Sequence, residues 1–187
     1  MKWENIEPDF QTTPFSEFAN KVAPLTTLKV WSRLNQSNSV AIGNRVLTQI
    51  HRHLQRQRVE QGGLLIGQVF ELDTSKNLLM NITNSVEATD FQGTSASLSM
   101  DGTVWQSATD KLAPGEFIIG WYHSHPNLGA FFSGTDRMTQ RNFFDFEHSV
   151  GLCVDHIRGE HAWFNGGDSQ PFGDREIFIF LDNETEF

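Results

Sequence analysis

The chain has 187 residues, a length typical of one domain, and 38% of them are hydrophobic, including 16 Phe and 5 Trp. This composition excludes an intrinsically disordered protein. A formal net charge of −9 argues against nucleic acid as a partner, because an acidic protein repels phosphates. The short basic cluster formed by residues 51–53 with Arg56 and Arg58 is better explained as the solvated face of a helix.

The single cysteine, Cys153, has no partner in the chain for an internal disulfide, and nothing calls for an oxidising compartment. The N-terminal sequence MKWENIEPDF contains no apolar stretch of the kind found in signal peptides. No segment approaches the roughly 20 apolar residues of a membrane span. We therefore expect a cytoplasmic protein with no membrane partner.

Residues 1–35 contain Pro8, Pro14 and Pro24 and show no clear helical or strand period. We interpret them as an N-terminal extension that wraps around the domain or contacts a partner. The domain itself is expected over residues 36–187.

Within that domain, helical spacing of Val46, Leu47, Ile50 and Leu54 predicts an amphipathic helix with a basic outer face. Apolar runs bounded by turn residues predict the strands, and a run rich in Gly, Ser and Thr predicts a long loop. The strands are expected at 39–43, 60–72, 78–88, 117–123, 149–155, 161–165 and 176–181, the helices at 44–58, 104–113 and 136–146, and the loop at 87–102. This order predicts an α/β fold with a mixed or mainly antiparallel sheet flanked by helices, rather than a doubly wound sheet.

The stretch GWYHSHPNLGAFFSGTD at residues 120–136 carries the strongest chemical signal. His123 and His125 are two residues apart at the end of an apolar strand, so both imidazoles can point at one ion. Asp136 follows eleven residues later, and a loop of that length can bring its carboxylate back as a third ligand. Two His and one Asp, with water in the fourth position, form a catalytic zinc arrangement. The alternative is an exposed His-Ser-His loop without a metal.

The same stretch resembles the signature of the JAMM (MPN-type) metalloprotease family: His-x-His, seven residues, Ser, two residues, Asp. The family pattern adds an upstream glutamate near a Gly-Gly-x-x-x-Gly strand, which Glu60 and the run QGGLLIG match here. The resemblance covers about residues 38–165. It implies a cytidine-deaminase-like MPN/JAMM fold with a curved sheet, and one zinc ion held by His123, His125 and Asp136.

By the same resemblance, Glu60 is the general base that moves a proton from water to the leaving amine, as metal-assisted amide hydrolysis requires. Ser133 is then the hydrogen-bond donor to the oxyanion. Two alternatives stay open. Glu60 could instead pair with Arg56 or Arg58, and Ser133 could cap a helix, a role compatible with catalysis.

Other candidates have simpler explanations. His51 and His53 are two apart on a predicted helix, so they point about 200° apart and cannot easily share a metal. Cys153 lies in the middle of a predicted strand, which favours a buried small hydrophobic residue over a nucleophile. Trp121 and Tyr122 are expected to be packing residues. With only one Cys in the chain, a second, Cys-containing zinc site is not expected.

JAMM relatives cleave peptide or isopeptide bonds after the Gly-Gly tails of ubiquitin-like proteins. Some bacterial members are encoded with ubiquitin-like, activating-enzyme-like and conjugating-enzyme-like proteins in antiphage systems. The resemblance therefore implies a zinc isopeptidase for a ubiquitin-like protein, with those proteins as partners. The tail is expected to bind along the segment that contains Val86, Asp90, Phe91 and Met100. Two alternatives are an MPN scaffold or binding module in a larger complex, and a hydrolase that releases an amino acid from a sulfur-carrier protein.

Overall fold

A single mixed sheet organises the protein in a computed structural model that describes residues 10–88 and 102–181. The strands are β1 (Thr13–Pro14), β2 (Ser39–Gly43), β3 (Gly62–Glu71), β4 (Leu78–Glu87), β5 (Phe117–Ser124), β6 (Val150–Asp155), β7 (Glu160–Asn165), β8 (Gln170–Pro171) and β9 (Ile177–Phe180). The helices are α1 (Phe15–Ala19), α2 (Pro24–Leu34), α3 (Asn44–Leu54), α4 (Gly102–Thr109), α5 (Gly134–Phe143) and the 3₁₀ turn η1 (Asp174–Glu176).

The sheet runs in the order β8-β7-β6-β5-β3-β4-β2-β9, with β1 paired to β3 outside this path. The sheet combines parallel pairs (β2 with β4, β2 with β9, β5 with β6) and antiparallel ones (β3 with β4 and β5, β6 with β7). The α/β class and the mixed sheet flanked by helices are therefore confirmed. So is each strand expected between residues 39 and 181, with no boundary shifted by more than two residues.

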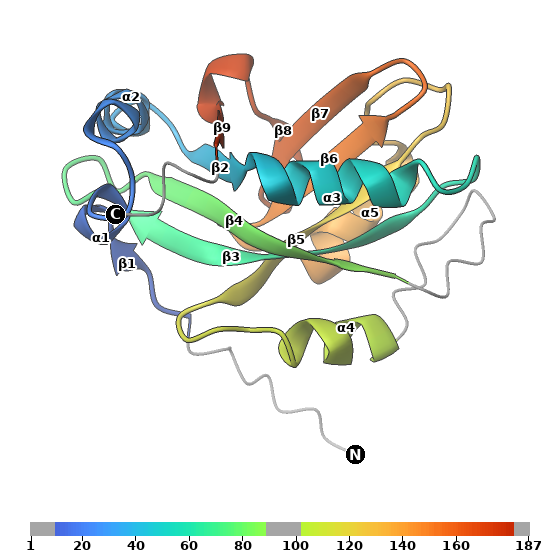
Figure 1. Ribbon diagram of the computed structural model, residues 1–187, viewed down its shortest axis with the longest axis horizontal. Coiled ribbons are helices and arrows are strands. Elements are labelled where there is room, and N and C mark those ends of the chain that lie inside the picture. The colour runs from blue at the N-terminus through green and yellow to red at the C-terminus, as the bar shows by residue number, and fades with distance from the viewer. Residues whose placement is uncertain (1–9, 89–101, 182–187) are drawn as a thin grey trace.

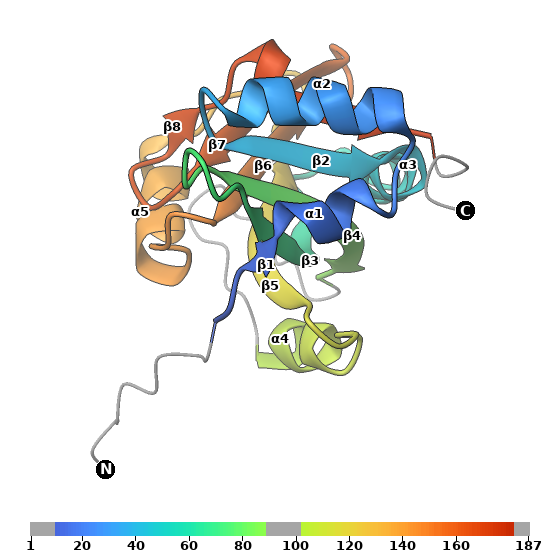
Figure 2. The ribbon, with the colours of Figure 1, turned by 90° about the vertical axis from the view of Figure 1, so that its left-hand side faces the viewer.

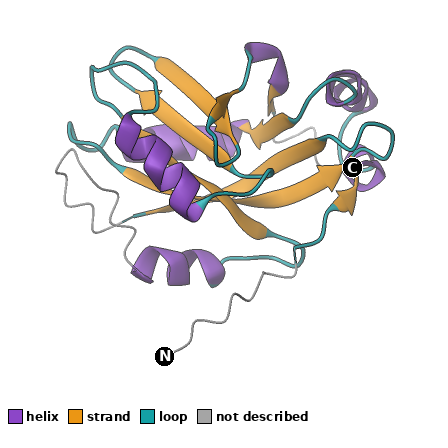
Figure 3. Cartoon of the chain, turned by 180° about the vertical axis from the view of Figure 1, so that it is seen from behind, coloured by secondary structure: helices purple, strands orange, loops and turns teal. Residues whose placement is uncertain are grey.

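The helices cover both faces of the sheet. Helix α3 lies on one face and α5 on the other, as Figure 1 and the view from behind in Figure 3 show. Val46, Ile50 and Leu54 of α3 pack in one apolar cluster, whereas α4 and the end of α5 border a second cluster that contains Trp121 and Cys153. Because side chains alternate along a strand, β5 and β6 direct Trp121, His123 and Cys153 to the α5 face.

The N-terminal segment is more ordered than expected. Residues 13–34, in which we found no helical or strand period, form β1, α1 and α2 (Figure 2). Their apolar side chains join a third core cluster with Phe70 and Leu79 of the sheet. These elements are regular although the sequence shows no clear period over this range, and the segment lies against the rest of the domain. Burial of Phe15, Phe18, Val30 and Leu34 makes it part of the core.

Two glycines at the start of β3 bring three strands unusually close. A Cβ at Gly62 would lie 2.6 Å from the Tyr122 carbonyl oxygen, and one at Gly63 would lie 2.1 Å from the Val86 carbonyl oxygen. Both distances are far inside van der Waals contact, so a side chain at either position would push β3 away from its neighbours. This close approach matters for function because Gly62 is the register partner of His123.

Candidate metal centre

Three side chains predicted as zinc ligands converge at the end of β5. The Nε2 atoms of His123 and His125 lie 3.1 Å apart. His123 Nε2 lies 3.4 Å from Asp136 Oδ1, and His125 Nε2 lies 3.4 Å from Asp136 Oδ2. Donors bound tetrahedrally to zinc at about 2.0–2.1 Å are themselves about 3.4 Å apart. In this donor triangle of His123, His125 and Asp136, each imidazole therefore lies at the separation of zinc donors from its own Asp136 oxygen.

Burial and aromatic contacts hold the two imidazole rings in place. His123 and His125 are only 2% and 5% exposed. The Trp121 ring stacks on the His123 ring with centroids 4.5 Å apart, and the Phe131 ring meets His125 edge-on at 5.0 Å. The Trp121 indole N–H donates to Gln140 Oε1 at 2.6 Å, which fixes the stacking ring to α5. The prediction that Trp121 is a packing residue is confirmed.

Glu60 precedes β3, and its side chain reaches the histidine pair. Its Oε1 lies 4.0 Å from His125 Nε2, and its side chain is 29% exposed. The next residue, Gln61, is tied to the end of β5: its backbone N–H donates to Ser124 Oγ at 3.1 Å, and its carbonyl accepts from the Ser124 N–H at 2.9 Å. The structure thus places Glu60 beside the histidine pair.

The alternative partner for Glu60 is occupied elsewhere. Arg56 forms a two-pronged ion pair with Glu87, with N–O distances of 2.5 and 3.0 Å. Among the described residues, Glu60 forms no ion pair with Arg56 or Arg58, so the structure does not support the pairing alternative that the sequence left open. Glu60 is partly exposed and next to the donor triangle, which is where a proton-transfer group for metal-assisted hydrolysis has to be.

Ser133 and Asp136 form the N-terminal cap of α5. The Asp136 backbone N–H donates to Ser133 Oγ at 3.3 Å, and the Ser133 backbone N–H donates to Asp136 Oδ2 at 2.6 Å. This is a capping box. The helix-cap role for Ser133 is therefore present. Because Ser133 Oγ accepts in this contact, its hydroxyl hydrogen remains available to donate.

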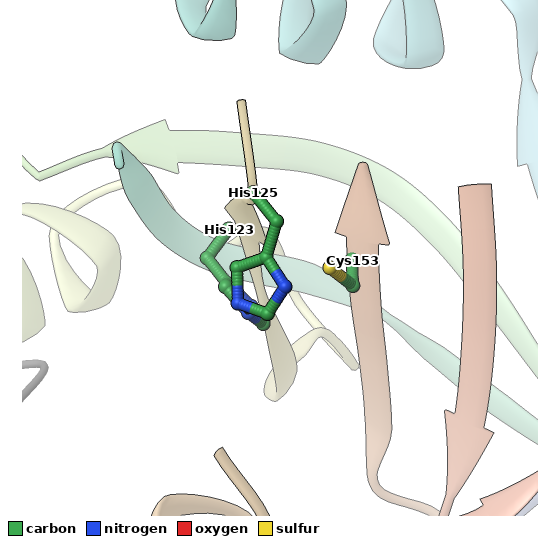
Figure 4. A group of neighbouring side chains, drawn as sticks. All are labelled: His123, His125 and Cys153. Atoms are coloured by element: carbon green, nitrogen blue, oxygen red, sulfur yellow. The ribbon is translucent and has the colours of Figure 1, made fainter. Parts of the chain in front are cut away.

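Cys153 is a neighbour of the histidines that we did not anticipate. The sequence predicted a buried small residue, and Cys153 is indeed fully buried. Its sulfur and one nitrogen from each of His123 and His125 all lie within 4.8 Å of one another, and Figure 4 shows the sulfur facing the rings. Two possible donors, Asp136 and Cys153, thus share one histidine pair. The missing signal was strand order, which places Cys153 directly beside His123.

Electrostatics favour a charged triad when no metal is bound. Burial lowers the pKa of His125, but contact with the Asp136 carboxylate raises it more, to about 10. The pKa of His123 is raised by the same balance of burial and carboxylate contact. Burial raises the pKa of Asp136, whereas its contacts with the two histidines lower it well below its usual range. Since a metal binds neutral imidazole, any metal ion that binds here has to displace protons from the histidines.

Asp155 anchors the loops that frame the site. This buried carboxylate, at the end of β6, accepts backbone N–H bonds from Asn127 and Gly129 in one loop at 3.0 and 2.8 Å. It accepts from Ile157 and Arg158 in the other at 3.0 and 3.1 Å. Gly129 has φ +95°, a conformation that glycine adopts readily. The loop between His125 and Asp136 is therefore fastened near its start.

The predicted substrate segment lies mostly outside the described residues. Asp90, Phe91 and Met100 fall in the range 89–101, for which the structure gives no description. Val86 is described and is only 3% exposed, in the core beside Leu64. Its side chain is therefore unavailable to a substrate, which corrects that part of the prediction. Val86 instead lies in the antiparallel pair of β3 and β4.

Comparisons with known proteins agree on the fold. The family model for prokaryotic homologs of the JAB domain matches residues 43–163. The solution structure of protein DSY2949 from Desulfitobacterium hafniense covers 79% of this chain and 99% of its own, with a TM-score of 0.59 at 19% identity. At that identity the likeness concerns the fold alone.

Curated relatives share sequence with this chain over part of their length. NAD(+) hydrolase TcpA from Theionarchaea archaeon (strain DG-70-1) is 31% identical over 80% of this chain and 42% of itself. The 26S proteasome non-ATPase regulatory subunit 14 from Caenorhabditis elegans is 28% identical over 68% of this chain and 41% of itself. COP9 signalosome complex subunit 5 from the same organism is 25% identical, over 83% and 43% respectively.

The chain therefore spans less than half the length of these relatives. Among the residues that the structure describes, no helix has the length and apolar character needed to cross a membrane. The family model covers more than half of the chain, and its range includes the histidine pair, Asp136 and Glu60. This protein belongs to the family of prokaryotic homologs of the JAB domain.

Proposed function

We propose that the protein is a zinc-dependent peptidase or isopeptidase that cleaves after the C-terminal tail of a ubiquitin-like protein. The observation that carries the proposal is the donor triangle of His123, His125 and Asp136, next to a partly exposed carboxylate. The two Nε2 atoms lie 3.1 Å apart, and each lies 3.4 Å from its own Asp136 oxygen. A zinc ion held by three protein donors lowers the pKa of water in its open position to about 7 and polarises a carbonyl.

Each surrounding residue then has a defined task. Glu60 takes a proton from the attacking water and delivers it to the nitrogen of the scissile amide, so that the C–N bond breaks and an amine leaves. The Ser133 hydroxyl donates to the carbonyl oxygen as negative charge develops on it. Trp121 and Phe131 keep the histidine rings from rotating.

An apolar rim supports a protein substrate. Leu128 and Phe131, in the loop between the ligands, are 60% and 47% exposed, and the Leu128 N–H donates to the His125 carbonyl at 3.2 Å. Exposed apolar side chains beside a reactive site are typical of surfaces that bind another protein. The tail itself is proposed to bind along the segment with Asp90, Phe91 and Met100. Activating-enzyme-like and conjugating-enzyme-like proteins of a bacterial antiphage system remain the proposed partners.

The test is cleavage of ubiquitin-like fusions by zinc-loaded protein, read by gel electrophoresis and mass spectrometry, with a chelator-treated control. Glu60→Gln should retain zinc and lose about 10²–10⁴-fold in kcat. Glu71→Gln is the matched control, since Glu71 ends β3, the strand that follows Glu60, and makes only an exposed ion pair with Lys76. If Glu60→Gln keeps more than about a tenth of the activity, Glu60 is not the base.

A scaffold role is the second candidate, because two of the relatives are named as subunits of complexes. It predicts that the zinc-loaded protein cleaves no fusion and that chelation leaves partner binding unchanged. Two further substrates belong in the assay. A sulfur-carrier conjugate tests release of an amino acid, and NAD⁺ tests whether the activity named for TcpA occurs in this chain.

A further inference from the structure

Cys153 has a position that the proposed hydrolysis does not use. It is the register partner of His123 in the parallel pair of β5 and β6, so both side chains leave the sheet on the same face. The sulfur comes within 4.8 Å of a nitrogen of each histidine and lies beside the His125 ring in Figure 4. All three side chains are at most 5% exposed.

Packing alone does not explain a thiol at this place. The cavity would accept an apolar side chain of similar size, because the neighbouring cluster consists of Leu64, Trp121, Phe132 and other hydrophobic residues. A buried thiol next to two imidazoles is instead a donor set for a soft or borderline metal ion. The Nδ1 atoms of His123 and His125 are buried and lack hydrogen-bond partners, so no hydrogen bond through these atoms ties the rings to another side chain.

We propose that Cys153 is a fourth protein ligand of the metal bound by His123, His125 and Asp136, and that it keeps the resting site closed. The proposal rests on the zinc site of the proposed function. Four protein donors complete a tetrahedral shell, which is the arrangement of structural zinc sites, whereas catalytic sites leave one position for water. Hydrolysis then requires water to replace the sulfur by simple ligand exchange, with no change in oxidation state.

X-ray absorption spectroscopy of the zinc-loaded full chain tests the ligand directly. Sulfur scatters from about 2.3 Å, clearly outside nitrogen and oxygen ligands at about 2.0–2.2 Å. The chain has only one Cys, so a thiolate shell has one possible source. We expect one sulfur neighbour in the wild type and none in Cys153→Val or Cys153→Ser. Zinc surrounded only by nitrogen and oxygen in the wild type would overturn the proposal, as would a sulfur shell that persists in Cys153→Val.

Kinetics test the closed state separately. Removing the competing ligand should raise kcat for a ubiquitin-like fusion in Cys153→Val, with one zinc still bound. A kcat equal to or below that of the wild type would overturn the closed resting state. Sulfur ligation without cleavage of any fusion would contradict the proposed function and leave Cys153 as a ligand. Cleavage of a fusion by protein whose zinc has only nitrogen and oxygen neighbours would support the proposed function and contradict the role of Cys153 as a ligand.

Discussion

The chain contains two His-x-His pairs, and the structure uses them in opposite ways. His123 and His125 end a strand, and their Nε2 atoms meet at 3.1 Å. His51 and His53 lie on α3, where a two-residue step turns the side chain by about 200°. His53 points into the core and bonds Tyr122 Oη through Nδ1 at 2.9 Å. Identical spacing thus gives a donor pair on a strand and a packing contact on a helix.

The largest effect is expected from breaking the strand pair. His125→Ala should remove most of the zinc and all measurable hydrolysis, because the site loses one of its two imidazole donors. His51→Ala, in the helical pair, should retain one zinc per chain. Elemental analysis of both purified variants makes the comparison, and wild-type zinc content in His125→Ala would refute the ligand assignment.

Substitution of Ser133 tests whether a residue beyond the histidine pair on β5 contributes to catalysis. Ser133→Ala removes the helix cap, which costs about 1 kcal/mol of stability, and the proposed oxyanion donor, which costs about 10²–10³-fold in kcat. Ser133→Thr keeps a hydroxyl and should restore most of both. Denaturant unfolding and steady-state kinetics separate the two roles. Lower stability with unchanged kcat would leave Ser133 as a cap alone.

For the histidine pair on α3, the expected effect is on the stability of the fold. His53→Phe keeps a ring in the core but leaves the buried Tyr122 hydroxyl without its partner, which costs about 1–3 kcal/mol. Zinc content should not change, since His53 does not face the metal centre. Chemical denaturation measures the loss, with His51→Ala as the control. A drop in zinc content in His53→Phe would show that the two pairs are coupled.

The smallest effect is a pair of opposite pH dependences in the metal-free protein. The folded-state pKa of His125 is raised to about 10, so its stabilisation is complete below pH 6.5 and is lost as the pH rises toward 10. Burial lowers the pKa of His53, so its contribution is present above pH 6.5 and is lost as the pH falls. Tm measured with chelator should therefore decline on both sides. His125→Ala should flatten only the alkaline decline, and an alkaline decline that persists unchanged would contradict this assignment.

The histidine comparison also shows what sequence can predict. The strand that carries His123, the helix after Asp136 and the glycines near Glu60 follow from local patterns, so the donor triangle could be anticipated. The Cys153 contact could not, because it depends on β6 lying parallel to β5, and no local pattern states which strands are neighbours. Helices α1 and α2 were missed for a different reason. Helix α1 has only five residues, and the burial of both helices comes from packing on the sheet.

One signal for α2 was nonetheless present. Pro24 stands at the first turn of the helix, where its fixed φ suits the start and its missing N–H costs nothing. Val30 and Leu34 then lie four residues apart and are both buried, as helical spacing requires. A proline that interrupts a search for periodicity can also mark where a helix begins.

The capping box has a consequence for how related sequences should be interpreted. Asp136 offers one oxygen to His123 and the other to both His125 and the Ser133 backbone, so selection for folding alone would preserve the Ser-x-x-Asp pattern. The histidines take no part in that cap. A gene copy freed from hydrolysis would therefore lose His123 or His125 before Ser133 or Asp136. A related sequence that keeps only the serine and the aspartate would then be a descendant of an active enzyme but not itself active.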